Sequence, residues 1–175
     1  MQGQQICFAS FMRTGNSFLR RVIELVTGVY TGSDMNLNVT LHMVGGNVAG
    51  EETLSHENLT WITKTHWPKQ SPGGSLNFAA QKCISIVRNP IDIIPSVGLL
   101  VNTGSHSLQS QVPLNELDPQ WWSRFSTEGT RTINSCHLAM REQCHPAVPT
   151  YYVRYEDLLL IPEATLNGLF RFMLG

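Results

Sequence analysis

The sequence predicts a three-layer α/β domain in which a mostly parallel central sheet is flanked by helices. Short apolar runs of strand length recur along the chain, and they alternate with stretches whose apolar residues repeat at helical spacing. Strands that alternate with helices pair in parallel and are covered on both faces. The length of 175 residues is that of one domain, so we treat residues 1–175 as a single domain.

The first predicted unit is a strand, a turn and a helix. The apolar run at 6–11 predicts a buried strand. Apolar residues at 18–26 then recur at helical spacing, with Asn16 or Ser17 as the cap of this helix and Gly28 as its stop. Such a unit places a helix N-terminus directly after a buried strand.

The next stretch is less regular. Residues 29–60 are rich in glycine, asparagine, threonine and serine, which predicts a loop-dominated segment with one short helix at most. Residues 61–66 predict a second strand that Pro68 ends, and the composition of 69–77 is that of a loop.

A third strand is predicted at 83–87, where a continuous apolar run suits a strand covered on both faces. Asn89 is placed to cap the following helix, and Pro90 fits its first position. Pro95 falls further inside this helix, so we expect it to kink the helix or to shorten its first half.

The last third of the chain predicts three more elements after a polar loop at 102–118. Residues 121–140 indicate a long helix with an aromatic-rich buried face, 150–155 a fourth strand, and 162–174 a final helix. The complete pattern is therefore strand and helix in alternation.

Composition excludes several classes of function. The chain is 42% apolar and 14% charged, which is typical of a globular protein. Its net charge of -1 provides no basic excess for a nucleic-acid backbone, so we expect no nucleic-acid partner. No apolar run approaches the roughly 20 residues of a membrane span, and the N-terminus does not resemble a signal peptide. We therefore expect a cytoplasmic location, or the Golgi lumen if the chain is a fragment of a longer one.

The cysteines do not predict a metal site. Cys7 and Cys83 lie inside strand-like runs and are expected to be buried small side chains. Two Cys-His pairs, at 136–137 and 144–145, do not have a usual zinc spacing. We expect no metal.

The turn after the first strand has the properties of an anion site. A helix start exposes unpaired N–H groups and the positive end of the helix dipole. Gly15 permits close approach, Thr14, Asn16 and Ser17 add donors, and Arg13 adds a charged planar fork. An ordinary strand-to-helix connection would show the same pattern, so the turn alone leaves both interpretations open.

A second candidate segment follows the third strand, where Arg88 and Ser96 lie on either side of a helix start. Together the two segments could hold a ligand that carries phosphate at both ends. The sequence lacks the Gly-Lys-Ser/Thr of a nucleotide-triphosphate P-loop, which disfavours a P-loop kinase of a small metabolite.

Four segments resemble the sulfotransferases that use 3′-phosphoadenosine 5′-phosphosulfate (PAPS). Ser-Phe-Met-Arg-Thr-Gly-Asn-Ser-Phe-Leu-Arg at 10–20 is similar to their 5′-phosphosulfate loop, and Arg-Asn-Pro-x-Asp-x-x-x-Ser at 88–96 to their 3′-phosphate motif. Lys-Thr-His-Trp-Pro at 64–68 resembles the segment that carries the catalytic histidine, and Tyr-Glu-Asp-Leu at 155–158 a late family segment. The four occur in the family's order across nearly the whole chain.

The resemblance implies a PAPS-binding α/β fold related to the P-loop nucleotide kinases. It implies a sulfotransferase that passes a sulfuryl group from PAPS, without a metal, to a hydroxyl or amine of a small-molecule or glycan acceptor. The family continues into an Arg-Lys-Gly-x-x-Gly loop that is absent here, so we expect a domain incomplete at its C-terminal end, with weakened PAPS affinity. A catalytically silent homologue that binds a nucleotide or a partner is the alternative.

The resemblance also implies roles for single residues. His66 would be the general base, with Lys64 and Arg13 facing the sulfuryl oxygens, and Arg88 and Ser96 would bind the 3′-phosphate. A structural histidine at a strand end is the other interpretation of His66.

The loop residues 14–17 would bind the 5′-phosphosulfate, and the adenine would lie near Phe18 and Tyr155. Core packing is the other interpretation of Tyr155. The sequence does not identify the acceptor. The variable loops offer Asn36, His42, Trp67 and His106 as possible lining residues of an acceptor pocket.

Overall fold

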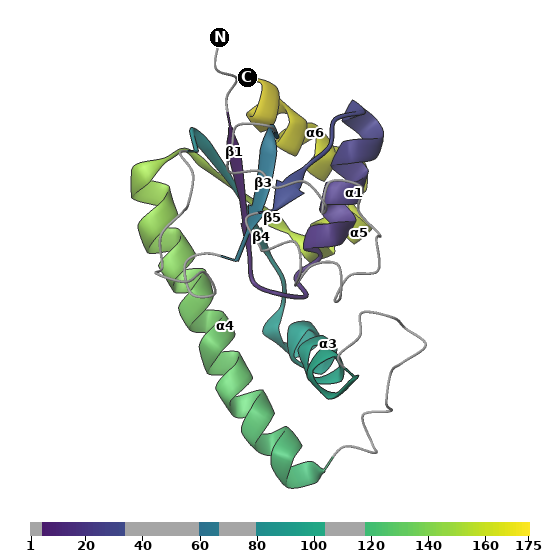
Figure 1. Cartoon of the computed structure of the whole chain (residues 1–175), viewed down its shortest axis with the longest axis vertical. Coiled ribbons are helices and arrows are strands. Elements are labelled where there is room, and N and C mark those ends of the chain that lie inside the picture. Colours follow the sequence, from purple (N-terminus) through teal and green to yellow (C-terminus); the bar gives the residue numbers. More distant parts are fainter. Residues whose placement is uncertain (1–4, 34–59, 67–79, 104–117) are drawn as a thin grey trace.

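The computed structural model describes residues 5–33, 60–66, 80–103 and 118–175. They form a five-stranded sheet in the order β2-β3-β1-β4-β5, and every adjacent pair of strands is parallel (Figure 1). The strands are β1 (Ile6–Ser10), β2 (Gly32–Ser33), β3 (Ile62–Thr65), β4 (Lys82–Val87) and β5 (Thr150–Arg154). The helices are α1 (Asn16–Thr27), α3 (Pro90–Thr103), α4 (Pro119–Ala147), α5 (Tyr155–Leu160) and α6 (Pro162–Leu174).

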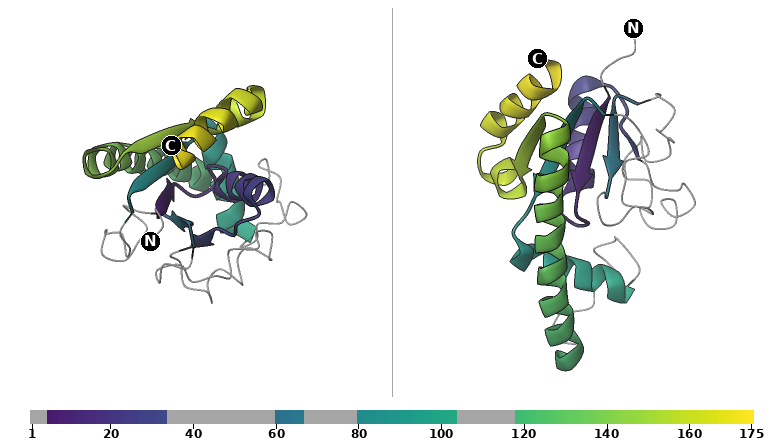
Figure 2. Two further views of the ribbon diagram at one scale, coloured as in Figure 1. Left: turned by 90° about the horizontal axis from the view of Figure 1, so that it is seen from above. Right: turned by 90° about the vertical axis from the view of Figure 1, so that its left-hand side faces the viewer.

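Helices cover both faces of this sheet. In Figure 1, α4 lies on one side of the strands, and α1, α5 and α6 lie on the other; the two views of Figure 2 show the same arrangement from above and from the side. Residues of α3 and α4 pack on one face against Cys7 and Cys83, and residues of α1, α5 and α6 pack on the other face against Phe8 and Ile84. The predicted α/β fold with a parallel sheet flanked by helices is therefore confirmed.

The register of the sheet determines which chain segments meet. Strand β1 is central, with Ala9 paired to Thr65 of β3 on one side and to Ser85 of β4 on the other. All five residues of β1 are buried, as the continuous apolar run predicted. Because parallel strands share a direction, the segments that leave β1, β3 and β4 emerge at the same edge of the sheet.

Several predicted boundaries need correction. Neither Asn16 nor Ser17 caps α1, because Gly15 is the N-cap and no side chain caps this helix. Helix α3 is continuous through Pro95, so the expected shortening of its first half is wrong. The predicted cap by Asn89 is confirmed, because its Oδ1 accepts the amide of Ile91 at 3.0 Å.

Two short elements were not predicted at all. Strand β2 lies in the stretch at 29–60 that was expected to form loops, and it has two residues. Helix α5 begins at Tyr155, which was assigned to the end of the fourth strand. The final helix was predicted at its observed position, with Leu169 and Met173 buried.

Lys82 ties the end of α6 to the sheet. Its Nζ donates to the carbonyl of Phe172 at 2.8 Å and lies 5.4 Å from the centre of the Phe172 ring. A cation at a helix C-terminus meets carbonyl groups that lack partners inside the helix. We expect Lys82→Met to lower the free energy of unfolding, measured by urea denaturation, by about 1–2 kcal/mol.

The matched control for this prediction is Arg171→Met, which removes an exposed cation from the last turn of the same helix. This change is expected to cost less than about 0.5 kcal/mol. Equal losses in the two variants would show that general charge at the helix end, and not the bond to Phe172, stabilises α6.

Candidate functional site

The turn between β1 and α1 has an unusual backbone. Arg13 has φ 63° and Gly15 has φ 97°, so both residues lie in the left-handed region that few non-glycine residues adopt. Thr14 Oγ1 donates to the carbonyl of Phe11 at 2.7 Å and closes the turn. Asn16 Nδ2 donates to Ser10 Oγ at 2.7 Å. The amides of the first turn of α1 therefore have no side-chain cap, which leaves this helix start open to an anion.

A cavity of about 240 Å³ lies beside this turn. It gathers residues from the β1–α1 turn, from α1, from the end of β3, and from α3 with the turn before it. This is the edge where the chain leaves the central strand β1 and its neighbour β4 toward opposite faces of the sheet, the usual position of a ligand site in such folds. The lining residues are Met12, Arg13, Gly15, Asn16, Ser17, Lys64, His66, Arg88 and Ser96.

The cavity brings together all but three of the catalytic and donor-binding residues predicted from the sequence. Thr14, Phe18 and Tyr155 do not line it: Thr14 is buried within the turn, Phe18 is 46% exposed, and Tyr155 packs behind the turn. Met12 lines the cavity and was not predicted, because an apolar residue in a loop gives no chemical signal.

The charged side chains that the structure describes around the cavity are all cationic. Arg13, Lys64 and Arg88 contribute three cationic groups, and no carboxylate belongs to the residues that the structure describes around it. Burial, and then the nearby charge of Arg88, lower the pKa of Arg13. An anion placed between the two guanidinium groups would remove this repulsion, so the electrostatics favour an anionic ligand.

Hydrogen bonds join the two predicted motifs. Arg13 Nε donates to Ser96 Oγ at 2.7 Å, and Arg88 Nη1 donates to the carbonyl of Arg13 at 3.1 Å. Ser96 thus accepts a bond from Arg13 and keeps its own proton to donate toward the cavity. Both contacts connect segments more than 70 residues apart and fix the two arginine-bearing turns relative to each other.

Tyr155 supports both turns from behind. The guanidinium carbon of Arg88 lies 4.4 Å from the centre of the Tyr155 ring, and Phe18 meets this ring edge-on at 6.3 Å. A Cβ atom added to Gly15 would lie 2.5 Å from Tyr155 Cε2 and closer still to Cδ2. The ring therefore occupies the space that a larger residue at position 15 would need.

We expect Gly15→Ala to lower the free energy of unfolding by about 2–4 kcal/mol, because it adds a clash with an aromatic ring to an unfavourable φ. Gly28→Ala is the matched control. Gly28 also has a positive φ, of 68°, but nothing lies within 4 Å of its added Cβ. This control is expected to cost about 1 kcal/mol, and chemical denaturation of both variants tests the difference. Equal losses of stability in the two variants would mean that the Tyr155 ring moves aside at little energetic cost.

His66 has a defined orientation and tautomer. Its Nδ1 lies 2.8 Å from the carbonyl oxygen of Ser10, and because a carbonyl only accepts, Nδ1 carries the proton. The lone pair is then on Nε2. Burial lowers the pKa of His66 to about 4, with further lowering by the charges of Lys64 and Arg20 and a partial opposing effect of the bond to Ser10. At neutral pH His66 is an uncharged proton acceptor.

Other sequence predictions fall outside the described part of the chain. Asn36, His42, Trp67 and His106, proposed as possible acceptor contacts, lie outside it, as do the side chains at 144–145. Among the described residues, no group of three histidine, cysteine or acidic side chains is placed to hold a metal ion. No helix in the described ranges has both the length and the apolar character needed to cross a bilayer.

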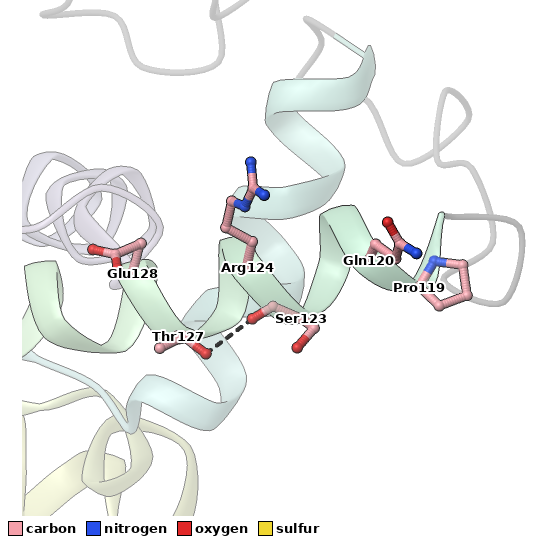
Figure 3. A pocket seen from close by; sticks show the side chains of 6 residues that line it. All are labelled: Pro119, Gln120, Ser123, Arg124, Thr127 and Glu128. Carbon is pink, nitrogen blue, oxygen red and sulfur yellow. Dashed lines mark hydrogen bonds between the residues drawn. The ribbon is translucent and has the colours of Figure 1, made fainter.

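Two further hollows lie away from this cavity or behind it. One, of about 480 Å³, is a shallow surface on α4 alone, where Thr127 donates to the carbonyl of Ser123 (Figure 3). Another, of about 370 Å³, lies between β4, β5 and α4, and Arg88 is shared between it and the cationic cavity. Arg154 at its edge is paired with Glu156 at 3.9 Å and Asp157 at 3.5 Å. Neither hollow gathers charges of one sign as the first cavity does.

Comparison with known proteins does not assign the chain. No protein-family model matches it. A search of the curated proteins likewise finds no match.

Proposed function

We propose that this chain is a sulfotransferase domain, with a P-loop-kinase-like arrangement, whose cationic cavity binds PAPS. The observation that carries the proposal is that one cavity contains Arg13, Lys64, His66, Arg88 and Ser96. These residues come from three separate segments whose sequences resemble three motifs of one family. Parallel strands bring their following turns to one edge of a sheet, so the proposal is supported by the residue types that meet there, namely three cations, a histidine and a serine.

The two ends of the donor have different partners in this proposal. The 5′-phosphosulfate lies against the uncapped start of α1, near Asn16 and Ser17, where N–H groups and the helix dipole favour negative charge. The 3′-phosphate lies against Arg88 and the hydroxyl of Ser96, which Arg13 orients.

The proposed reaction is an in-line transfer to a hydroxyl or amine of a small molecule or glycan. The acceptor atom forms a bond to sulfur while the bond from sulfur to the 5′-phosphate oxygen breaks and leaves its electrons on that oxygen. The acceptor proton passes to Nε2 of His66, which the bond to Ser10 keeps as the unprotonated nitrogen. Lys64 and Arg13 stabilise the charge that moves through the sulfuryl group to the leaving phosphate.

A second candidate is a catalytically silent domain that binds the same anionic nucleotide. The pKa of His66 favours this candidate, because a base with a pKa of about 4 accepts a proton only weakly. A bound anion would raise this pKa, so the two candidates differ in what happens after the donor binds.

Two measurements separate these candidates. Calorimetry should show that 3′,5′-ADP binds at least about tenfold more tightly than 5′-AMP, because only the former engages Arg88 and Ser96. Transfer of labelled sulfate from PAPS to a panel of phenols, alcohols and glycans then tests the reaction. Absence of 3′,5′-ADP binding refutes both candidates, and binding with no transfer across the panel supports the silent one.

A further inference from the structure

Arg20 is a buried cation to which the sequence analysis assigned no role. It lies on α1, one helical turn after Asn16, and its exposed fraction is 0%. Burying a guanidinium group is costly unless its N–H groups are paired. The hydrogen-bond partners of Arg20 therefore indicate which part of the structure it holds in place.

Two of the contacts of Arg20 are with Thr31, which is also buried. Arg20 Nε donates to Thr31 Oγ1 at 2.8 Å, and Nη2 donates to the carbonyl of Thr31 at 3.4 Å. Glu24, one turn further along α1, accepts both the amide of Thr31 at 2.9 Å and its hydroxyl at 2.7 Å through Oε1. Two opposite charges on one helix therefore hold the backbone and the side chain of a single threonine.

Thr31 directly precedes strand β2, so this network determines where β2 lies. Gly32 and Ser33 of β2 pair in parallel with Thr63 and Lys64 of β3. The ladder of a two-residue strand is short, and the four bonds to Thr31 add an anchor directly before it. The side of β3 opposite to β1 is thus fixed from α1 at the level of Lys64.

The charge of Arg20 also affects the pKa of His66, which lines the cavity. Arg20 does not line the cavity, yet its guanidinium is one of the two cationic groups that lower the pKa of His66, the other being Lys64. The bond from His66 to Ser10 of β1 acts in the opposite direction. Arg20 is therefore connected to His66 through the field as well as through the packing of β2 on β3.

We propose that Arg20, acting with Glu24 through Thr31, is a positioning residue that fixes β2 against β3 and so sets the places of Lys64 and His66 in the cavity. This inference rests on the proposed function, in which Lys64 and His66 act at the transferring group. The donor itself is held by the β1–α1 turn and by Arg88, so loosening the network should affect turnover more than donor binding.

The test compares Thr31→Val with Thr31→Ser. The valine side chain keeps the shape of threonine but neither accepts from Arg20 Nε nor donates to Glu24 Oε1, whereas the serine side chain does both; the two bonds of the backbone remain in each variant. In Thr31→Val we expect kcat to fall about tenfold, with the dissociation constant of 3′,5′-ADP within about twofold of wild type. The pKa of His66, followed by NMR and assigned with His66→Gln, should rise by about half a unit or more as Arg20 loosens. Thr31→Ser should match the wild type in all three.

A second variant keeps the test decisive if valine prevents folding. Arg20→Lys retains a charge on α1 but has one ammonium group for the two oxygens of Thr31, and we expect changes in kcat and in the His66 titration of the same kind. Wild-type values in a folded variant of either kind overturn the inference, as do equal effects of serine and valine. If the wild-type chain transfers no sulfate, the proposed function fails and the titration of His66 alone decides this inference.

Discussion

Replacing Arg88 by methionine is expected to weaken the binding of 3′,5′-ADP about 100-fold, equivalent to about 2.7 kcal/mol. The expected loss of 5′-AMP binding is much smaller, about threefold. The reason is that Arg88 and Ser96 line the cavity and, in the proposed function, bind the 3′-phosphate, which 5′-AMP lacks. Calorimetric titration of both nucleotides gives the two ratios.

Control variants distinguish three contributions of Arg88 to nucleotide binding: its charge, its planar guanidinium geometry, and the contacts by which it holds neighbouring residues. Arg88→Lys keeps a cation without the planar fork and should lose about tenfold for 3′,5′-ADP. Arg154→Met removes the arginine that ends β5, whose side chain is 64% exposed and does not line this cavity, and it should change the binding of neither nucleotide. If Arg88→Met weakened both nucleotides equally, Arg88 would act by holding the carbonyl of Arg13 and the ring of Tyr155, and not by binding the 3′-phosphate.

The site could be predicted because parallel strands carry their following turns to one edge of a sheet. Arg13 and Arg88 are 75 residues apart, yet each lies within a few residues of the end of an apolar run, and those runs became the adjacent strands β1 and β4. Once the runs are assigned as neighbouring parallel strands, the meeting of the two turns follows without knowledge of any side-chain contact. The prediction required only the correct strands, not their exact boundaries.

The elements that escaped prediction lack a signal of their own. Strand β2 is Gly32–Ser33, which has no apolar pattern and is positioned by the bonds that Thr31 makes with α1. Helix α5 begins at Tyr155 directly after β5, so no turn residue marks the boundary. The network of Arg20 was equally invisible, because an arginine in an amphipathic helix is ordinarily exposed and only the fold buries it.

Removing the proposed base is expected to have the largest effect on turnover. His66→Gln should reduce kcat about 1000-fold while the dissociation constant of 3′,5′-ADP stays within about threefold. Glutamine can still donate a hydrogen bond to the carbonyl of Ser10, so it can keep this contact of His66, but it has no basic nitrogen. Single-turnover transfer of labelled sulfate measures the loss, and an unchanged rate would assign His66 a purely structural role.

The pH dependence of the same residue gives an independent check on catalysis. In the empty cavity the pKa of His66 is about 4, so the acid limb of kcat/KM, which reports the free enzyme, should lie near this value. The anionic donor favours the protonated imidazole, so the acid limb of kcat, which reports the complex, should lie at higher pH. Both limbs should disappear in His66→Gln, and a limb that persists there belongs to another group.

The titration of His66 should also make the free energy of unfolding depend on pH, in a direction that the lowered pKa determines. Burial, together with Lys64 and Arg20, lowers the pKa of His66 from 6.5 to about 4, so between these values the unfolded chain binds more protons than the folded one. The free energy of unfolding must then fall as the pH is lowered from about 6.5 to about 4, by up to about 3 kcal/mol from this residue. Burial also lowers the pKa of His137, so His137→Gln is the control that removes the only other resolved histidine shift in the described part of the chain. Urea denaturation across this range should show a flatter profile for His66→Gln than for His137→Gln, and two equally steep profiles would mean that His66 is not held neutral by its buried, cationic surroundings.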